Sequence, residues 1–173
     1  GVGLFAIGLI AGLVAMICQT RRYNRGDRWL REQFLRGDLH LQHLVVNSLF
    51  FRRANTNFFG EPRNWTDSLL WHHACHTVDL FQYQTDQSAD KAFALRGPID
   101  RTLGIELDMT IGLTAPSGEL LSFALSFNNV GEPGTYSRYI CDRETYIARF
   151  DSLTTPDGLP VDTSSVGSET GPQ

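Results

Sequence analysis

Side chains that can bind a metal ion gather in one short stretch of the chain. Four of them lie within five residues: His72, His73, Cys75 and His76. On a helix, His72 and His76 share a face, because residues four apart are neighbours there. A third nitrogen ligand would come from His40 or His43 if their segment were a helix lying alongside, and zinc, copper or a haem iron accepts such a set. The sequence therefore offers a metal site at His72, His76 and His73.

The same histidines also fit ordinary helix-surface or interface positions. The stretch lacks the glutamate of a His-Glu-x-x-His zinc hydrolase, and the chain has no Cys-x-x-Cys pair. Cys75 and His76 point about 100° apart on a helix and cannot act as nucleophile and base. We find no phosphate loop and no dinucleotide fingerprint, since 131–134 (Gly-Glu-Pro-Gly) is typical of a turn. No assembled active site is visible, and we predict a protein that is not an enzyme and has no cofactor except a possible metal ion.

The first eighteen residues carry no charge. As a helix this stretch would cover about 27 Å, close to the roughly 30 Å hydrocarbon thickness of a bilayer. Nothing basic precedes the apolar run, and no small-residue cleavage site follows it, so a cleaved signal peptide fits poorly. We therefore predict a transmembrane helix at 1–20. Its small residues repeat at a spacing that favours close helix packing: Gly8, Gly12, Ala11 and Ala15.

Arginines crowd the segment directly after this apolar run. They include Arg21, Arg22, Arg25 and Arg28, which we expect at the membrane surface against anionic lipid headgroups. Because positive charge stays inside, the N-terminus would lie outside and the C-terminal domain in the cytoplasm, or in an organellar matrix or stroma. Residues 19–63 carry a balance of plus five and residues 64–173 one of minus nine. This distribution suits a membrane-tethered domain and predicts no nucleic-acid partner.

Helical patterns dominate the first half of the chain. Residues 25–35 are amphipathic and end at Gly37, so we interpret 21–37 as a basic juxtamembrane segment. Asp38 is a good N-cap for a second helix running to about Phe59, with apolar residues at helical spacing. A third helix is predicted from Asn64 or Thr66 to Phe81, followed by a polar loop at 82–90.

Alternation replaces the helical period beyond Gly97. Residues 105–113 and 121–127 alternate apolar with polar around a turn at 115–118, which predicts a β-hairpin. Strands at 136–141 and 145–150 would extend it into an antiparallel meander covered by the helices. We thus predict an α+β fold with a single N-terminal transmembrane helix and a soluble domain at 38–150. Residues 151–173, poor in apolar side chains, would form a flexible or partner-docked tail.

Three functions remain open at this point. The main prediction is a non-catalytic accessory or assembly subunit of a multi-subunit membrane complex, with the other subunits as partners. The alternative is a metal-binding membrane-anchored protein or enzyme that uses His72, His73 and His76. A minor alternative is a pilin: an apolar helix, an amphipathic continuation and an antiparallel sheet are similar to the plan of type IV pilins and pseudopilins. Those proteins usually begin with phenylalanine and carry glutamate at the fifth position, where this chain has Gly1 and Phe5.

Overall fold

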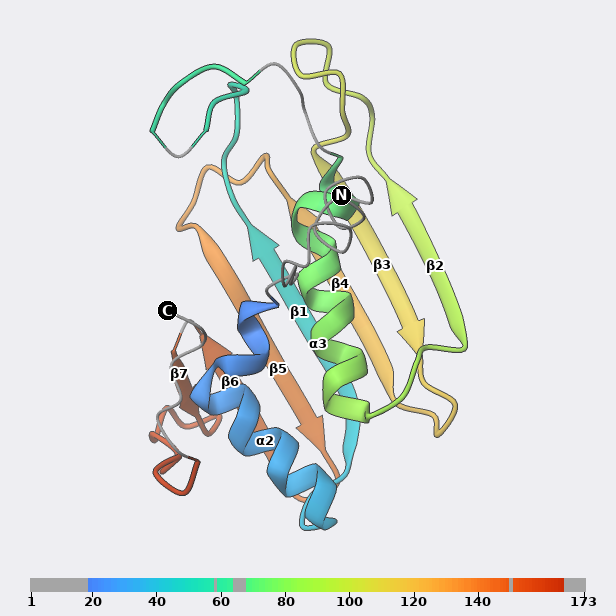
Figure 1. Ribbon diagram of the computed structural model, residues 1–173, viewed down its shortest axis with the longest axis vertical. Coiled ribbons are helices and arrows are strands. Elements are labelled where there is room, and N and C mark those ends of the chain that lie inside the picture. Colours follow the sequence, from blue (N-terminus) through green and yellow to red (C-terminus); the bar gives the residue numbers. More distant parts are fainter. Residues whose placement is uncertain (1–18, 58, 64–67, 150, 167–173) are drawn as a thin grey trace, which may run out of the picture.

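One mixed β-sheet forms the body of the described part of the chain, and the helices of that part lie on one side of it (Figure 1). The computed structural model describes residues 19–57, 59–63, 68–149 and 151–166. The strands are β1 (Leu41–Leu49), β2 (Lys91–Arg96), β3 (Asp108–Thr114), β4 (Leu120–Ser126), β5 (Gly134–Cys141), β6 (Thr145–Arg149) and β7 (Ser152–Thr154). The helices are η1 (Thr20–Tyr23, a 3-10 turn), α2 (Arg25–Arg36), η2 (Leu70–Ala74, a π-helical turn) and α3 (Cys75–Thr85), which continues η2.

Strand β1 occupies the centre of the sheet, whose order is β2-β3-β4-β1-β5-β6-β7. Val46 of β1 lies opposite Phe123 of the parallel strand β4 and opposite Ser137 of the antiparallel strand β5. All other neighbouring strands are antiparallel. The central parallel pair brings the carboxyl ends of β1 and β4 to the same edge of the sheet.

The hydrophobic core lies between the sheet and the two long helices. Inward-facing Leu44 and Val46 of β1 and Phe123 of β4 pack in one cluster with Leu30 of α2 and Phe81 of α3. Burying side chains of this size contributes about 1.5–3 kcal/mol each, so this cluster is the main attachment of the helices to the sheet.

Several local predictions are confirmed. The amphipathic helix at 25–35 is α2, and it ends at Gly37, whose φ of 75° is the left-handed conformation that glycine adopts without strain. The hairpin at 105–127 is β3 and β4, and the strands at 136–141 and 145–150 are β5 and β6. The third helix is present as η2 and α3, but it extends to Thr85, into the segment predicted as a loop.

The predicted fold class is nevertheless wrong. The helix predicted from Asp38 is strand β1, because this segment pairs along its whole length with β4 and β5. The meander is wrong for the same reason, since β1 separates β4 from β5. No strand was predicted at β2, which forms one edge of the sheet. Part of the predicted tail is strand β7, and its Leu153 and the later Val166 are buried against the rest of the chain.

The predicted membrane span falls on residues that the structure does not describe. Residues 1–18, with Gly8, Gly12, Ala11 and Ala15, lie outside the described ranges. Of the helices in the described part, none has the length and apolar character needed to cross a bilayer. Of the arginines predicted at a membrane surface, Arg21 donates to Ser137 Oγ (3.0 Å), and Arg22 pairs with Asp79. Arg25 and Arg28 lie in α2.

Candidate functional site

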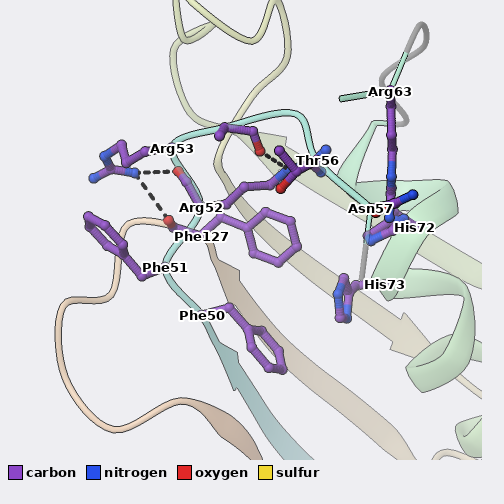
Figure 2. A pocket seen from close by; sticks show the side chains of 11 residues that line it. Phe50, Phe51, Arg52, Arg53, Thr56, Asn57, Arg63, His72, His73 and Phe127 are labelled. Carbon is purple, nitrogen blue, oxygen red and sulfur yellow. Dashed lines mark hydrogen bonds between the residues drawn. The ribbon is translucent and has the colours of Figure 1, made fainter. Parts of the chain in front are cut away.

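A pocket of about 530 Å³ opens where β1 and β4 end (Figure 2). Its walls come from the segment after β1, from Arg63, from His72 and His73 of η2, and from Phe127 after β4. Ligands of open sheets that contain parallel strands characteristically bind outside the carboxyl ends of those strands. We therefore take this pocket as the candidate functional site.

Backbone hydrogen bonds hold the two strand ends together beneath the pocket. The amide of Arg52 donates to the carbonyl of Phe127 (3.0 Å), and the amide of Asn129 donates to the carbonyl of Phe50 (3.0 Å). Beyond them the chain turns at Gly60, where φ is 83°, and the amide of Arg63 donates to the carbonyl of Asn55 (2.9 Å). This turn carries Arg63 back to the pocket.

His73 lies in an aromatic slot at the inner wall. Its ring centroid is 4.9 Å from that of Phe50, 5.0 Å from that of Phe127 and 4.9 Å from that of His72. Burial, together with the neighbouring His72, His76 and Arg52, which disfavour another positive charge, lowers the pKa of His73 to about 4. At neutral pH the His73 imidazole is therefore uncharged, and one ring nitrogen can accept a hydrogen bond while the other donates one.

Three arginines give the pocket its positive charge. Arg52 donates to Asn55 Oδ1 (2.8 Å) and lies with its guanidinium 5.8 Å from the ring centre of Phe127. Arg53 donates to the carbonyl of Arg52 (2.7 Å), which holds its guanidinium above Phe51. Arg63 extends toward His72 in the view of Figure 2. Guanidinium groups bind carboxylates with paired, charge-assisted hydrogen bonds, so the pocket is suited to an anionic ligand.

The π-helical turn η2 determines how the histidines are presented. His72 and His73 are both in this turn, at the start of the helix that continues as α3, and both line the pocket. π-helical turns occur frequently at functional sites. The N-terminal end of a helix carries a partial positive charge, which stabilises a negatively charged group placed there. The preceding residues 64–67 lie outside the described ranges.

The other histidines named by the sequence lie elsewhere. His76 is one turn further along, where Nδ1 is 2.8 Å from Gln19 Oε1. His43 is on β1 and contacts Ser122 (2.8 Å), while His40 contacts Asp142, both at the opposite end of β1 from the pocket. His40 and His43 therefore do not lie beside His72 and His73, and the metal site predicted at His72, His76 and His73 stays a prediction. In the part of the chain that the structure describes, no group of three or more His, Cys, Asp or Glu side chains is placed to hold a metal ion.

Sequence reasoning missed the arginines of this site. Arg52, Arg53 and Arg63 entered only as part of the positive balance beside the predicted membrane. The available signal was two adjacent arginines that directly follow Phe50 and Phe51 at the end of an apolar run. If that apolar run had been interpreted as a strand, the arginines at its end would have indicated a binding site for an anion.

Comparison with known proteins identifies the family. Residues 25–167 match the family described as bacterial oxidoreductases, C-terminal. The chain is 50% identical over 155 residues to 4-carboxy-2-hydroxymuconate-6-semialdehyde dehydrogenase from Sphingobium sp. (strain NBRC 103272 / SYK-6). That alignment covers 90% of this chain and 49% of the relative, so the chain spans about half the length of that dehydrogenase.

Solved structures share the fold at low sequence identity. The WlbA dehydrogenase from Bordetella pertussis, in complex with NADH and UDP-GlcNAcA, superposes with a TM-score of 0.70 at 14% identity, covering 88% of this chain and 47% of that one. UDP-N-acetylglucosamine 3-dehydrogenase from Acidithiobacillus ferrooxidans gives a TM-score of 0.66 at 18% identity, covering 93% and 52%.

These matches correct the predicted function. The prediction of an accessory subunit of a membrane complex is wrong, and so is the prediction that the protein is not an enzyme. The family that matches the chain and the 50% identical relative are both oxidoreductases. The predicted single-pass membrane location fails on the same match to a dehydrogenase. The predicted partners, other subunits and lipid headgroups but no nucleic acid, remain predictions. Because residues 25–167 match the family model, this chain belongs to the bacterial oxidoreductase family and contains the C-terminal domain of that family.

Proposed function

We propose that this chain forms the substrate-binding part of an NAD(H)-dependent dehydrogenase whose substrate carries a carboxylate. The observation that carries the proposal is the placing of Arg63 and the histidines of η2 in one pocket at the carboxyl ends of β1 and β4. The 50% identical relative supports it, because its name describes a carboxylated semialdehyde as substrate.

The two sides of the pocket have different chemistry. Arg63, with Arg52 and Arg53 nearby, supplies positive charge for a carboxylate. His73 supplies an uncharged imidazole between Phe50 and Phe127. A substrate anchored by its carboxylate would place its oxygen-bearing carbon toward the histidines, where the imidazole can accept a hydrogen bond from a substrate hydroxyl.

The cofactor assignment comes from the relatives' chemistry. NAD+ accepts a hydride in such reactions, and the Bordetella dehydrogenase is in complex with NADH. Within the described ranges, no glycine-rich turn leads from a strand into a helix, which is the usual cradle for a dinucleotide diphosphate. These residues therefore do not fit the dinucleotide itself, and we assign them to the substrate alone.

The test compares two substrates and two arginines. In the protein at its full natural length, NAD+ reduction is measured with a carboxylated semialdehyde and with its methyl ester. We expect Arg63→Gln to raise KM for the carboxylate about 10- to 100-fold, as the loss of one charge-assisted contact predicts, and to leave the ester unaffected. Arg143→Gln, at the exposed turn between β5 and β6, is the matched control and should change neither KM.

Two results would overturn the proposal. Equal KM values for the acid and its ester would show that the pocket does not recognise a carboxylate. Binding of the carboxylate without any reduction of NAD+ or NADP+ would remove the dehydrogenase assignment and leave only a binding domain.

A further inference from the structure

Two buried oxygen atoms lack a hydrogen-bond donor where α2, α3 and β5 meet. They are Asp27 Oδ2 and Gln84 Oε1, and neither has a hydrogen-bond partner among the described residues. Both residues are only 2% exposed, so neither atom is supplied with a donor by bulk water. Buried acceptors are almost always satisfied in folded proteins, because leaving one without a donor is costly. The presence of two such atoms in one place therefore needs a physical explanation.

The two oxygens lie around a single hydroxyl group. Tyr139 donates to Asp27 Oδ1 (2.5 Å), and Gln84 lies close enough to the same hydroxyl to influence it by hydrogen bonding. The amide nitrogen of Gln84 is already used, because it donates to the backbone carbonyl of Asp27 (2.8 Å). Two acceptors cannot bond to each other, but a protonated carboxyl group is a donor. One proton on Asp27 would therefore satisfy both oxygens.

Arg21 offers the same carboxyl group a different partner. Arg21 Nε lies 3.9 Å from Asp27 Oδ2, which is too long for a hydrogen bond, while Arg21 Nη2 donates to Ser137 Oγ (3.0 Å). Among the described residues, Arg21 of η1 and Tyr139 of β5 are the charged and titratable groups that act on this carboxyl, and α3 contributes the uncharged Gln84. A carboxylate binds a guanidinium more strongly than a carboxylic acid does. The position of Arg21 should therefore follow the charge on Asp27.

The two partners of Asp27 act on opposite ends of α3. Gln84 lies in the last turn of this helix. Arg21 belongs to η1, next to Gln19, whose Oε1 is 2.8 Å from Nδ1 of His76 in the first turn of α3. Helix α3 continues η2, so both attachments bear on the helix that presents the histidines of the pocket.

We propose that the carboxyl group of Asp27 is a proton-operated switch in the attachment of α3. With its proton in place, Asp27 Oδ2 donates to Gln84 Oε1, and the last turn of α3 is tied to α2. When the proton leaves to water, the carboxylate draws the Arg21 guanidinium into a direct ion pair, and Gln84 Oε1 loses its donor. The segment η1 is then held more firmly and the last turn of α3 less firmly. This inference does not depend on which substrate the pocket binds.

Burial places the switch in an accessible pH range. Desolvation raises the pKa of Asp27 more than Arg21 and the Tyr139 hydrogen bond lower it. The proton is therefore lost above the usual aspartate value of about 3.9, after the exposed carboxyl groups have ionised. The effect of Asp27 can thus be measured separately from the titration of the protein surface.

The test is hydrogen exchange measured by mass spectrometry on the protein at its full natural length, from about pH 5 to about pH 9. Asp27→Asn is measured at each pH, because it removes the titration and shares the intrinsic pH dependence of exchange. Relative to this variant, we expect wild-type peptides that cover η1 to exchange more slowly as pH rises. Peptides that cover the last turn of α3 should exchange faster. Each change should reach about 10-fold, which is the effect of one hydrogen bond gained or lost.

Infrared spectroscopy follows the proton itself. The difference spectrum between the wild type and Asp27→Asn should contain the band of a protonated carboxyl group at low pH. This band should disappear as pH rises, with the same midpoint as the two changes in hydrogen exchange.

Arg21→Gln tests the second partner. Without the guanidinium, the midpoint should rise by about one pH unit, and η1 should no longer exchange more slowly at high pH. Asp86→Asn is the matched control, because Asp86 pairs with Arg31 at the end of α3 but its side chain is 69% exposed. Asparagine also tolerates the left-handed φ of 57° at this position. This control should leave the midpoint unchanged.

Three outcomes would overturn the inference. The peptides of η1 and of the last turn of α3 could change in the same direction, as they would if Asp27 only stabilised the whole fold. The infrared band could be absent at about pH 5, where ordinary aspartates are ionised. Asp86→Asn could shift the midpoint as much as Arg21→Gln. If circular dichroism shows that Asp27→Asn does not fold, Arg21→Gln compared with the wild type retains both the exchange and the midpoint measurements.

Discussion

The hydroxyl of Tyr139 on β5 donates a hydrogen bond of 2.5 Å to Oδ1 of Asp27 on α2, and both residues are buried. Gln84 of α3 donates to the backbone carbonyl of the same Asp27 (2.8 Å), and Arg21 Nε lies 3.9 Å from its Oδ2. This group of polar residues joins the two helices to the sheet within the hydrophobic core.

Removing the hydroxyl of Tyr139 should destabilise the fold. Tyr139→Phe leaves Asp27 buried without its hydrogen bond, and we expect the free energy of unfolding to fall by about 1–3 kcal/mol in urea denaturation. Tyr136→Phe is the control on the same strand, because its hydroxyl makes only a 3.4 Å contact with Arg149. A Tyr139→Phe effect no larger than that of the control would contradict this account.

Asp27 should make stability depend on pH. Burial raises the pKa of Asp27, more than Arg21 and the Tyr139 hydrogen bond lower it. The folded protein therefore keeps this proton to higher pH than the unfolded chain, whose Asp pKa is about 3.9. The stability gained is fully present below that value and is lost as pH rises through the raised pKa.

We expect the unfolding free energy of the wild type, relative to Asp27→Asn, to decline as pH increases from 4. Urea denaturation of both proteins between pH 4 and pH 8 measures this difference. A difference that is constant over the range would contradict a raised pKa.

His73 should make stability depend on pH in the opposite direction to Asp27. Burial, followed by His72, His76 and Arg52, lowers the pKa of His73 to about 4, while an unfolded histidine titrates near 6.5. The stability contributed by its uncharged form is present above pH 6.5 and is lost as pH falls through about 4. In an NMR titration, the ring resonances of His73 should shift with a midpoint near 4. A midpoint near 6.5 would show that the aromatic slot is open to water.

Gly37 should be necessary for the end of α2. Its φ of 75° favours glycine, and its amide donates to the carbonyls of Gln33 and Phe34. Gly37→Ala should lower the free energy of unfolding by about 1 kcal/mol because a Cβ atom is strained in this conformation. Gly131→Ala is the control, since Gly131 does not have a positive φ. Equal thermal melting shifts for both variants would contradict the role of Gly37.

The prediction of a helix at 38–59 failed for an identifiable reason. Leu41, Leu44, Val45 and Leu49 have helical spacing, yet as β1 the same segment has Leu44 and Val46 buried between two neighbouring strands. A central strand is paired on both sides. Which of its residues are apolar therefore depends on the packing of the neighbouring strands as well as on strict alternation along the strand itself. Those neighbours, β4 and β5, lie more than 70 residues later in the sequence.

Sequence by itself determined the elements whose signals are local: the helix that ends at Gly37, the hairpin of β3 and β4, the strands β5 and β6, and the presence of His72 and His73 on a helix. Only the tertiary structure decided that β1 separates β4 from β5, and that Arg63 and the histidines of η2 share a pocket with the residues after β1. Capping, turn chemistry and alternation act over a few residues, whereas the order of strands depends on which distant segments bury their apolar faces together.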